Sequence, residues 1–135
     1  MFEFAVLSRA DYACWQGIAG GGEGQETPVE AAKREAWEEA GIPSEAVLLP
    51  LDSLCSVPVY LFRDSAAWGE DMYVIPEYSF GMDCTGCEIV LSDEHTGLEW
   101  LLYPEAYQRL TYDSNRVALW ELHQRIQGQG PRLVS

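Results

Sequence analysis

The sequence predicts an α+β fold in which a mixed β-sheet lies between helices. Short runs of apolar, β-branched or aromatic residues recur along the chain, and only a few helical segments interrupt them. Such a pattern is typical of a sheet packed between helices. The chain has 135 residues, 47% of them hydrophobic, which is enough for one core of ordinary size. We therefore expect one domain over residues 1–135, with a frayed tail at 128–135.

The strand candidates are short and spread over the whole chain. Each has the apolar, β-branched or aromatic character that fits a half-buried pleated surface. They are Phe2–Ser8, Gln16–Ala19, Val47–Leu51, Val57–Phe62, Met72–Ile75, Tyr78–Gly81, Glu88–Leu91 and Leu98–Tyr103. A polar turn at 9–11 and a loop at Asp64–Asp71 connect some of them. We expect these strands to form one sheet.

The best helix of the sequence is expected at Pro28–Ala40. Thr27 can cap it, and Glu30 completes a Thr-x-x-Glu capping box. Gly41 supplies the left-handed residue that ends it. The glycine-rich segment before it, residues 20–24, must be a loop, because glycine costs about 1 kcal/mol relative to alanine inside a helix and packs no side chain inside a strand.

Two more helices are expected near the C-terminus, at Pro104–Leu110 and Ser114–Gln127. Asp113, Ser114 or Asn115 can start the second of them. Helical spacing also predicts which of its residues face the core. That face consists of Val117, Leu119, Trp120, Leu122 and Ile126.

The charge balance is strongly acidic, with 8 Lys and Arg against 22 Asp and Glu and a formal net charge of -14. Such a surface repels duplex nucleic acid. If the substrate is a phosphate compound, divalent cations must bridge it to the protein. No run approaches the roughly 18 to 20 apolar residues of a membrane helix, and the start lacks a basic segment and cleavage site. We therefore expect a cytoplasmic protein without a membrane partner.

The four cysteines are expected to be reduced, because the chain begins without a secretory signal. Cys84 and Cys87 form one CxxC spacing. A structural zinc site of the ribbon type requires a second such pair. Cys14 and Cys55 are isolated in the sequence, so a zinc site is not favoured. The favoured interpretation is a turn that carries two free thiols.

Three carboxylates share one side of the predicted Pro28–Ala40 helix. Glu35, Glu38 and Glu39 have the i, i+3, i+4 spacing that brings side chains together. A stripe of small apolar residues lies beside them, formed by Val29, Ala32, Ala36 and Ala40. On this evidence alone, a solvated acidic face balanced by Lys33 and Arg34 is the simpler explanation.

The glycine loop changes that interpretation, because its register with the helix forms a long motif. The pattern is G-x5-E-x7-R-E-U-x-E-E-x-G-U, where U is an apolar residue. It is matched at every fixed position by Gly20, Glu26, Arg34, Glu35, Ala36, Glu38, Glu39, Gly41 and Ile42. Because this pattern is the Nudix box, the chain resembles the Nudix hydrolases, and it has the loop and helix that the motif requires. The resemblance implies a Nudix-like α/β/α sandwich and hydrolysis of a phosphoanhydride bond.

The resemblance also implies roles for the box residues. Glu35, Glu38 and Glu39 are expected to bind Mg²⁺ or Mn²⁺ or to orient and deprotonate the attacking water, and which of them is the base differs among family members. Glu26 and Arg34 resemble a supporting ion pair that orients the helix, and the carbonyl of Gly20 can complete a metal shell.

One more ligand is implied outside the box. Ser92–His95, followed by Trp100 and Leu101, is similar to a segment of the dATP pyrophosphohydrolase and dihydroneopterin triphosphate pyrophosphatase branch that adds a metal-binding glutamate. Glu94 is the matching residue, and an exposed loop residue is its other interpretation. His95 is not assigned to the catalytic set, because a lone histidine is more often structural.

The predicted function is hydrolysis of a nucleoside triphosphate or pterin triphosphate to a monophosphate and pyrophosphate. A nucleoside diphosphate linked to another group is an alternative substrate, and a nucleotide-binding module without catalysis is an alternative function. Tyr12, Trp68 and Tyr73 could stack on the base or pterin ring of a substrate, but aromatic residues at this density usually pack in the protein. No substrate specificity is predicted from them. Family members usually have a further strand before Phe2–Ser8. We therefore expect that the true start of the protein lies upstream, that the edge of the sheet is built differently, or that a second subunit in a homodimer covers it.

Overall fold

The structure, a computed structural model, describes residues 2–18, 25–58 and 72–128. Several predicted features lie wholly or partly outside these ranges. They are Ala19 at the end of a predicted strand, Gly20 and its glycine loop, residues 59–62 of another predicted strand, the loop at Asp64–Asp71 with Trp68, and the tail from residue 129. No helix in the described ranges is long and apolar enough to cross a membrane.

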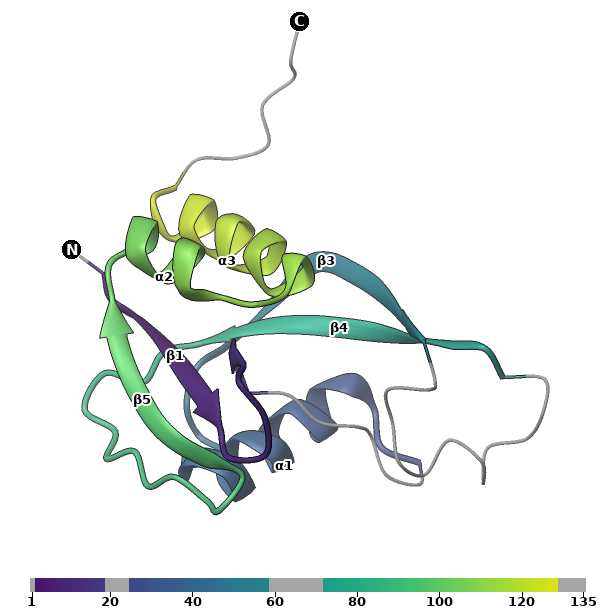
Figure 1. The fold of residues 1–135 in the computed structure, drawn as a ribbon, viewed down its shortest axis with the longest axis horizontal. Helices are drawn as coiled ribbons and strands as arrows, with labels where there is room; N and C mark the ends of the chain where they lie inside the picture. The colour runs from purple at the N-terminus through teal and green to yellow at the C-terminus, as the bar shows by residue number, and fades with distance from the viewer. Residues whose placement is uncertain (1, 19–24, 59–71, 129–135) are drawn as a thin grey trace, which may run out of the picture.

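The elements form layers, with strands between helices (Figure 1). Helices α2 (Tyr103–Arg109) and α3 (Asp113–Ile126) cover one side, and helix α1 (Pro28–Ala40) lies on the other. Each side has its own core. One core joins strand β1 to α2 and α3 through Phe4, Val6, Ala106, Leu110 and Leu119. The other joins Ala36 and Ala40 of α1 to Ile42. The predicted α+β class is confirmed.

The described strands pair in two antiparallel sheets, where the sequence led us to expect one mixed sheet. Strands β2 (Trp15–Gln16), β1 (Phe4–Arg9) and β5 (His95–Leu101) form the first, in that order. Strands β3 (Leu48–Pro58) and β4 (Val74–Met82) form the second. Residue patterns locate strands, but their pairing depends on contacts between distant segments.

Two pairs of predicted short strands are continuous. Val47–Leu51 and the start of Val57–Phe62 both belong to β3, whose pairing with β4 changes register between Pro50 and Leu54. Met72–Ile75 and Tyr78–Gly81 contribute to β4, which continues through Pro76. Irregular pairing of this kind lets a strand bend without ending, so each of these strands continues across the residues that separate the two predicted segments.

The predicted strand Glu88–Leu91 is wrong. This segment has no strand pairing in the structure and lies along the C-terminal end of α1. The backbone N–H of Val90 donates to the carbonyl of Ala40 at 2.9 Å, and that of Ser92 donates to the carbonyl of Glu39 at 3.0 Å. The last carbonyls of a helix need donors from outside the helix, and this segment supplies them.

The three predicted helices are confirmed, and α1 has the predicted bounds and caps. The Thr27 hydroxyl accepts from the backbone N–H of Glu30 at 3.2 Å, and the Glu30 carboxylate accepts from that of Thr27 at 3.2 Å. Gly41 ends the helix with a φ of 66° and donates to the carbonyl of Trp37. A side chain rarely adopts that backbone conformation, which explains glycine at this position.

The predicted core face of α3 is partly wrong. Leu119 is buried, and Leu122 and Ile126 pack against the same core. Val117 and Trp120, however, are 56% and 52% exposed. Helical spacing defines a wide apolar stripe, and only the position of α2 and the strands decides which part of it is covered.

The four cysteines are free thiols, as predicted. Cys84 and Cys87 lie at the two ends of a turn, in which the backbone N–H of Cys87 donates to the carbonyl of Cys84 at 3.0 Å.

Candidate active site

Helix α1 distributes its glutamates according to how it packs. Ala36 and Ala40 face the core, and Glu39 lies next to them on the buried side, with 1% of its surface exposed. Glu38 is on the open side, where 53% of its side chain is exposed, and Glu35 lies between these extremes. The carboxylates of the helix therefore range from buried to solvated within one turn.

Arg34 connects three acidic residues of the box. Its Nε donates to Glu26 at 2.8 Å, and its Nη1 lies 3.0 Å from Glu35 and 2.9 Å from Glu38. The guanidinium side chain is 19% exposed. It ties the segment before α1 to the helix and offsets repulsion among carboxylates that would otherwise be unbalanced.

Glu39 is the most perturbed acid of the site. Its burial, together with the nearby Glu35 and Glu94, raises the pKa of its carboxyl to about 9. Neither carboxylate oxygen has a hydrogen-bond donor among the described residues. A buried carboxylate without donors is costly, and a cation would stabilise its charged form.

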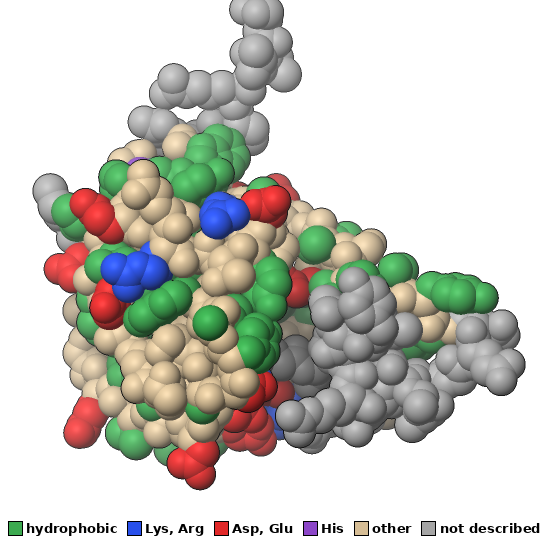
Figure 2. All heavy atoms as spheres, viewed as in Figure 1, with side chains coloured by type: hydrophobic (Ala, Val, Ile, Leu, Met, Phe, Trp, Pro, Cys, Tyr) green, Lys and Arg blue, Asp and Glu red, His purple; other side chains and the backbone are tan. Residues whose placement is uncertain are grey.

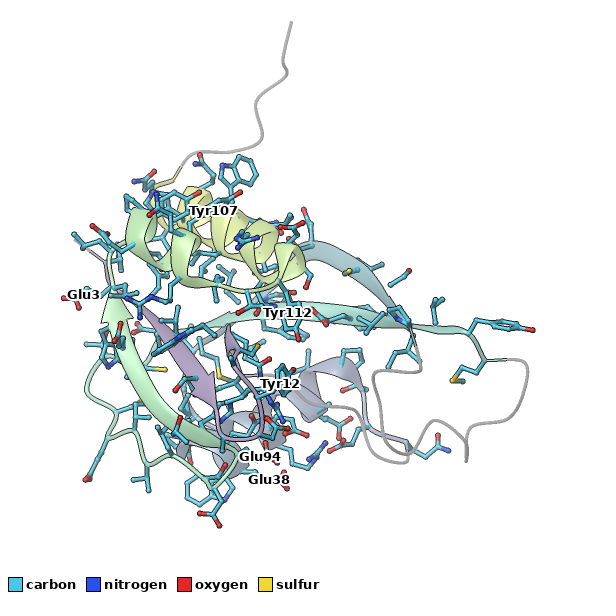
Figure 3. All side chains as sticks on the ribbon, in the orientation of Figure 1. Glu3, Tyr12, Glu38, Glu94, Tyr107 and Tyr112 are labelled. Carbon is cyan, nitrogen blue, oxygen red and sulfur yellow. The ribbon has the colours of Figure 1, made fainter. Side chains whose placement is uncertain are left out.

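Glu94 reaches the same site from the turn that precedes β5. Its carbonyl accepts from the backbone N–H of Ala10 at 2.9 Å, and its own N–H donates to the Ser92 hydroxyl at 3.3 Å. Its contribution to the raised pKa of Glu39 places its carboxylate near that group. Glu38 and Glu94 lie in the same part of the molecule although they come from different elements (Figure 3).

His95 is a member of this site that sequence reasoning missed. Its side chain is fully buried, and Nε2 lies 3.7 Å from Oε1 of Glu39. Neither ring nitrogen has a hydrogen-bond partner within the described ranges. Burial, reinforced by the nearby Arg9, lowers the pKa of the imidazole. The signal in the sequence was its position directly after Glu94.

Arg9 was also missed. Its Nε and Nη2 donate to the two carboxylate oxygens of Asp11 at 2.7 and 2.9 Å, and its guanidinium lies 5.3 Å from the centre of the Tyr12 ring. The hydrogen bonds to Asp11, with smaller effects from Tyr12 and Glu94, raise the pKa of the guanidinium. The chain has only 8 Lys and Arg, so the scarcity of basic residues is the sequence feature that could have pointed to Arg9.

Acidic side chains gather at the lower part of the face in Figure 2, over α1. The donor chemistry there suits a divalent cation, since Glu35, Glu38, Glu39 and Glu94 offer hard oxygen ligands. The structure does not present them as a preformed set: in the described ranges, no three His, Cys, Asp or Glu side chains converge on one metal position. Arg34 holds Glu35 and Glu38, so both must turn away from it to bind a metal.

Comparisons with known proteins identify the family of this chain. The NUDIX domain family model matches residues 3–120. A protein described as a Nudix hydrolase from Listeria monocytogenes is 41% identical, with a TM-score of 0.84 over 93% of this chain and 84% of that one. No curated protein matches.

Two less similar solved structures share the fold. The Escherichia coli dihydroneopterin triphosphate pyrophosphohydrolase is 24% identical, with a TM-score of 0.71 over 90% of this chain and 86% of that one. A Caenorhabditis elegans Ap4A hydrolase is 21% identical, with a TM-score of 0.64 over 93% and 88%. With the family match over most of its length and the box glutamates gathered on α1, this chain belongs to the Nudix family and is a hydrolase of pyrophosphate bonds.

Proposed function

We propose that the protein is a Mg²⁺-dependent pyrophosphohydrolase that converts a nucleoside triphosphate or a pterin triphosphate to a monophosphate and pyrophosphate. Mn²⁺ is an equivalent cofactor in this proposal. The observation that carries it is the buried, donor-free carboxylate of Glu39, with Glu35 on the same helix and Glu94 from a separate turn close to it. Such a group is best explained by a cation that it binds.

Each residue has a proposed part in the reaction. The cation is held by Glu39, by Glu94 and by whichever of Glu35 and Glu38 is not the base, and the Gly20 carbonyl, outside the described residues, completes its shell. Either Glu35 or Glu38 orients the attacking water and accepts its proton. When bound, the cation would lower the pKa of that water and offset the negative charge on the leaving group. Arg34 holds Glu35 and Glu38 on one side of the helix, and Glu26 anchors Arg34.

The net charge supports the dependence on a cation. A substrate with three phosphates carries several negative charges, and the chain has a formal charge of -14. Direct approach of the two is unfavourable, and a divalent cation between them reverses the sign of the local interaction.

A substrate panel tests the proposal. Wild-type protein with Mg²⁺ is incubated with nucleoside triphosphates, a pterin triphosphate and nucleoside diphosphate sugars. Released pyrophosphate is measured directly, and the products of the sugar nucleotides are measured as phosphate after phosphatase treatment. We expect pyrophosphate from a triphosphate. Phosphatase-sensitive products from a diphosphate sugar alone would shift the assignment to the linked diphosphates.

A variant pair identifies the site. Glu38→Gln keeps the shape of the side chain but removes its charge, and it is expected to lower kcat by at least about tenfold as loss of a ligand or base. Glu45→Gln, an exposed acid beyond the box, is the matched control and should keep wild-type activity. Full activity of Glu38→Gln, or no hydrolysis of any candidate by the wild type, contradicts the mechanism.

A further inference from the structure

The contact between Glu39 and His95 carries an inference about a residue that the mechanism above does not use. The two side chains are 2% and 0% exposed, and Oε1 of Glu39 lies 3.7 Å from Nε2 of His95. This separation is just longer than a hydrogen bond, which needs roughly 2.7–3.2 Å. Four buried polar atoms, two on each side chain, therefore lack hydrogen-bond partners among the described residues.

Leaving these atoms unpaired is expensive. Each unsatisfied buried polar group costs about 1–3 kcal/mol, and an apolar pair of similar size would avoid that cost. A histidine retained only for packing gains nothing from facing a carboxylate. The cost is recovered when the carboxylate is ionised, because the imidazole can then donate a charge-assisted hydrogen bond to it.

The backbone fixes the ring relative to Glu39. The N–H of Ser92 donates to the carbonyl of Glu39 at 3.0 Å, and the N–H of His95 donates to the carbonyl of Ser92 at 3.3 Å. Arg9 of β1 is the pairing partner of His95 in β5, so a second element holds the backbone of His95. The segment that carries the histidine is thus hydrogen-bonded to the same residue whose carboxylate it faces, so a small side-chain rotation suffices to close the gap.

We propose that His95 is a positioning residue, whose Nε2–H donates to Oε1 of Glu39 and leaves Oε2 free to bind the catalytic divalent cation. The inference rests on the metal-dependent function proposed above. A neutral imidazole has one N–H, and a hydrogen bond from Nε2 fixes the tautomer in which Nδ1 is the acceptor. The role is that of a residue behind the metal ligand, which restricts the rotamers of Glu39 and raises the fraction of molecules ready to bind.

Metal binding without substrate gives a direct test. Free Mn²⁺ is titrated into the full-length protein and followed by electron paramagnetic resonance, which detects the unbound ion. His95→Leu removes the donor, and His95→Asn places an amide nitrogen nearer the Nδ1 position. Both are expected to weaken Mn²⁺ binding by about 10–100-fold. His95→Gln, whose amide nitrogen can reach the Nε2 position, should bind nearly as well as the wild type.

His123 provides a matched control, because it is the other histidine of the chain and lies on α3. Its ring stacks on Tyr103 at a centroid distance of 4.1 Å, away from the carboxylates. His123→Gln should leave Mn²⁺ binding unchanged. A loss similar to that of His95→Leu would show a general effect of histidine replacement on the fold and would overturn the inference.

A double variant tests whether His95 acts through Glu39. In a Glu39→Gln background, His95→Leu should cause no further loss of Mn²⁺ affinity, because the carboxylate that it positions is absent. Independent, additive losses would overturn the inference. If circular dichroism shows that His95→Leu does not fold, the comparison of His95→Asn with His95→Gln replaces it. Equal Mn²⁺ affinities of these two variants would contradict a specific hydrogen bond from Nε2.

Failure of this inference and failure of the proposed function give different results. A wild type that neither binds Mn²⁺ nor hydrolyses any substrate removes the proposed function and the inference with it. A wild type that binds Mn²⁺ and hydrolyses a substrate, together with a folded His95→Leu variant of equal affinity, removes only the inference about His95.

Discussion

At Glu39, packing and charge oppose each other. The small side chains of Ala36 and Ala40 let α1 approach the core closely, and the same approach takes the neighbouring carboxylate out of water. Burial, together with the nearby Glu35 and Glu94, raises the pKa of the Glu39 carboxyl to about 9 in the metal-free protein. The helix is therefore stable without metal at low pH and carries a growing penalty as the pH rises.

The first prediction concerns this penalty. The pKa of Glu39 is raised by folding from 4.5 to about 9, so its stabilising contribution is complete below pH 4.5 and is lost as the pH rises towards 9. In a chelator, the free energy of unfolding of the wild type should fall over that window. The free energy of unfolding of Glu39→Gln should fall less over the same window, and the two losses should differ by at least about 1 kcal/mol near pH 9. Urea unfolding at several pH values measures both.

The control for this experiment is Glu45→Gln, which removes an exposed charge and should follow the wild-type curve. Parallel curves for the wild type and Glu39→Gln would mean that Glu39 is already ionised and paired in the metal-free protein.

At the scale of the elements, the Glu121 carboxylate of α3 binds the irregular part of β3, next to an ion pair between Arg125 and Asp52. Glu121 accepts from the backbone N–H of Asp52 at 2.6 Å, from the N–H and hydroxyl of Ser53 at 2.8 and 2.6 Å, and from Nε of Arg125 at 2.7 Å. Burial opposes ionisation of Glu121, but these hydrogen bonds outweigh it and lower its pKa to about 2. They also satisfy backbone groups that the register change in β3 leaves without strand partners.

Loss of this contact should be measurable and depend on pH. Glu121→Ala is expected to lower the free energy of unfolding by about 1–3 kcal/mol at pH 7. Because folding lowers the pKa of Glu121 from 4.5 to about 2, its contribution is present above pH 4.5 and is lost as the pH falls towards 2. The gap between wild type and variant should therefore narrow in acid. If the difference in free energy of unfolding between wild type and Glu121→Ala stays constant from pH 7 to about pH 2, the destabilisation comes from lost packing and not from the charge of Glu121.

The N-terminal cap of α1 gives a prediction about a single element. Thr27→Ala removes the hydroxyl that accepts from the N–H of Glu30, and it should cost about 1 kcal/mol of stability. Thr27→Ser keeps the hydroxyl and serves as the control. Thermal unfolding of both variants measures the difference. Equal losses for the two would show that the methyl group of Thr27, and not its hydroxyl, stabilises the helix.

At the scale of the whole molecule, the acidic charge links folding to metal. A formal charge of -14 favours expansion, and Glu35 and Glu94 add local repulsion at Glu39. Arg34 compensates part of it through Glu26, Glu35 and Glu38. A divalent cation bound only by the folded chain would compensate more.

We therefore predict that Mg²⁺ raises the thermal midpoint. At ten times its dissociation constant, a ligand of the folded state adds about 1.4 kcal/mol, which corresponds to roughly 3–6 °C for a chain of this size. Matched ionic strength in KCl should give a much smaller shift, and Glu39→Gln should lose most of the Mg²⁺ effect. No shift at millimolar Mg²⁺ would count against a metal site on α1.

Local chemistry determined a large part of this protein from sequence alone. The limits of α1 follow from Thr27, Glu30 and Gly41, because caps act over a few residues and need no distant partner. The box register follows in the same way, since the spacing along one helix brings Glu35, Glu38 and Glu39 together in any fold that contains that helix.

Only the tertiary structure decided what depends on segments far apart in the chain. It placed His95 against Glu39 and brought Glu94 to the same site, neither of which spacing can show. It left residues 88–91 along the end of α1 instead of in a sheet, because the helix carbonyls were the available acceptors. The sequence identified the box glutamates as candidate catalytic residues. Packing decided that Glu39 is the buried one and that His95 lies against it.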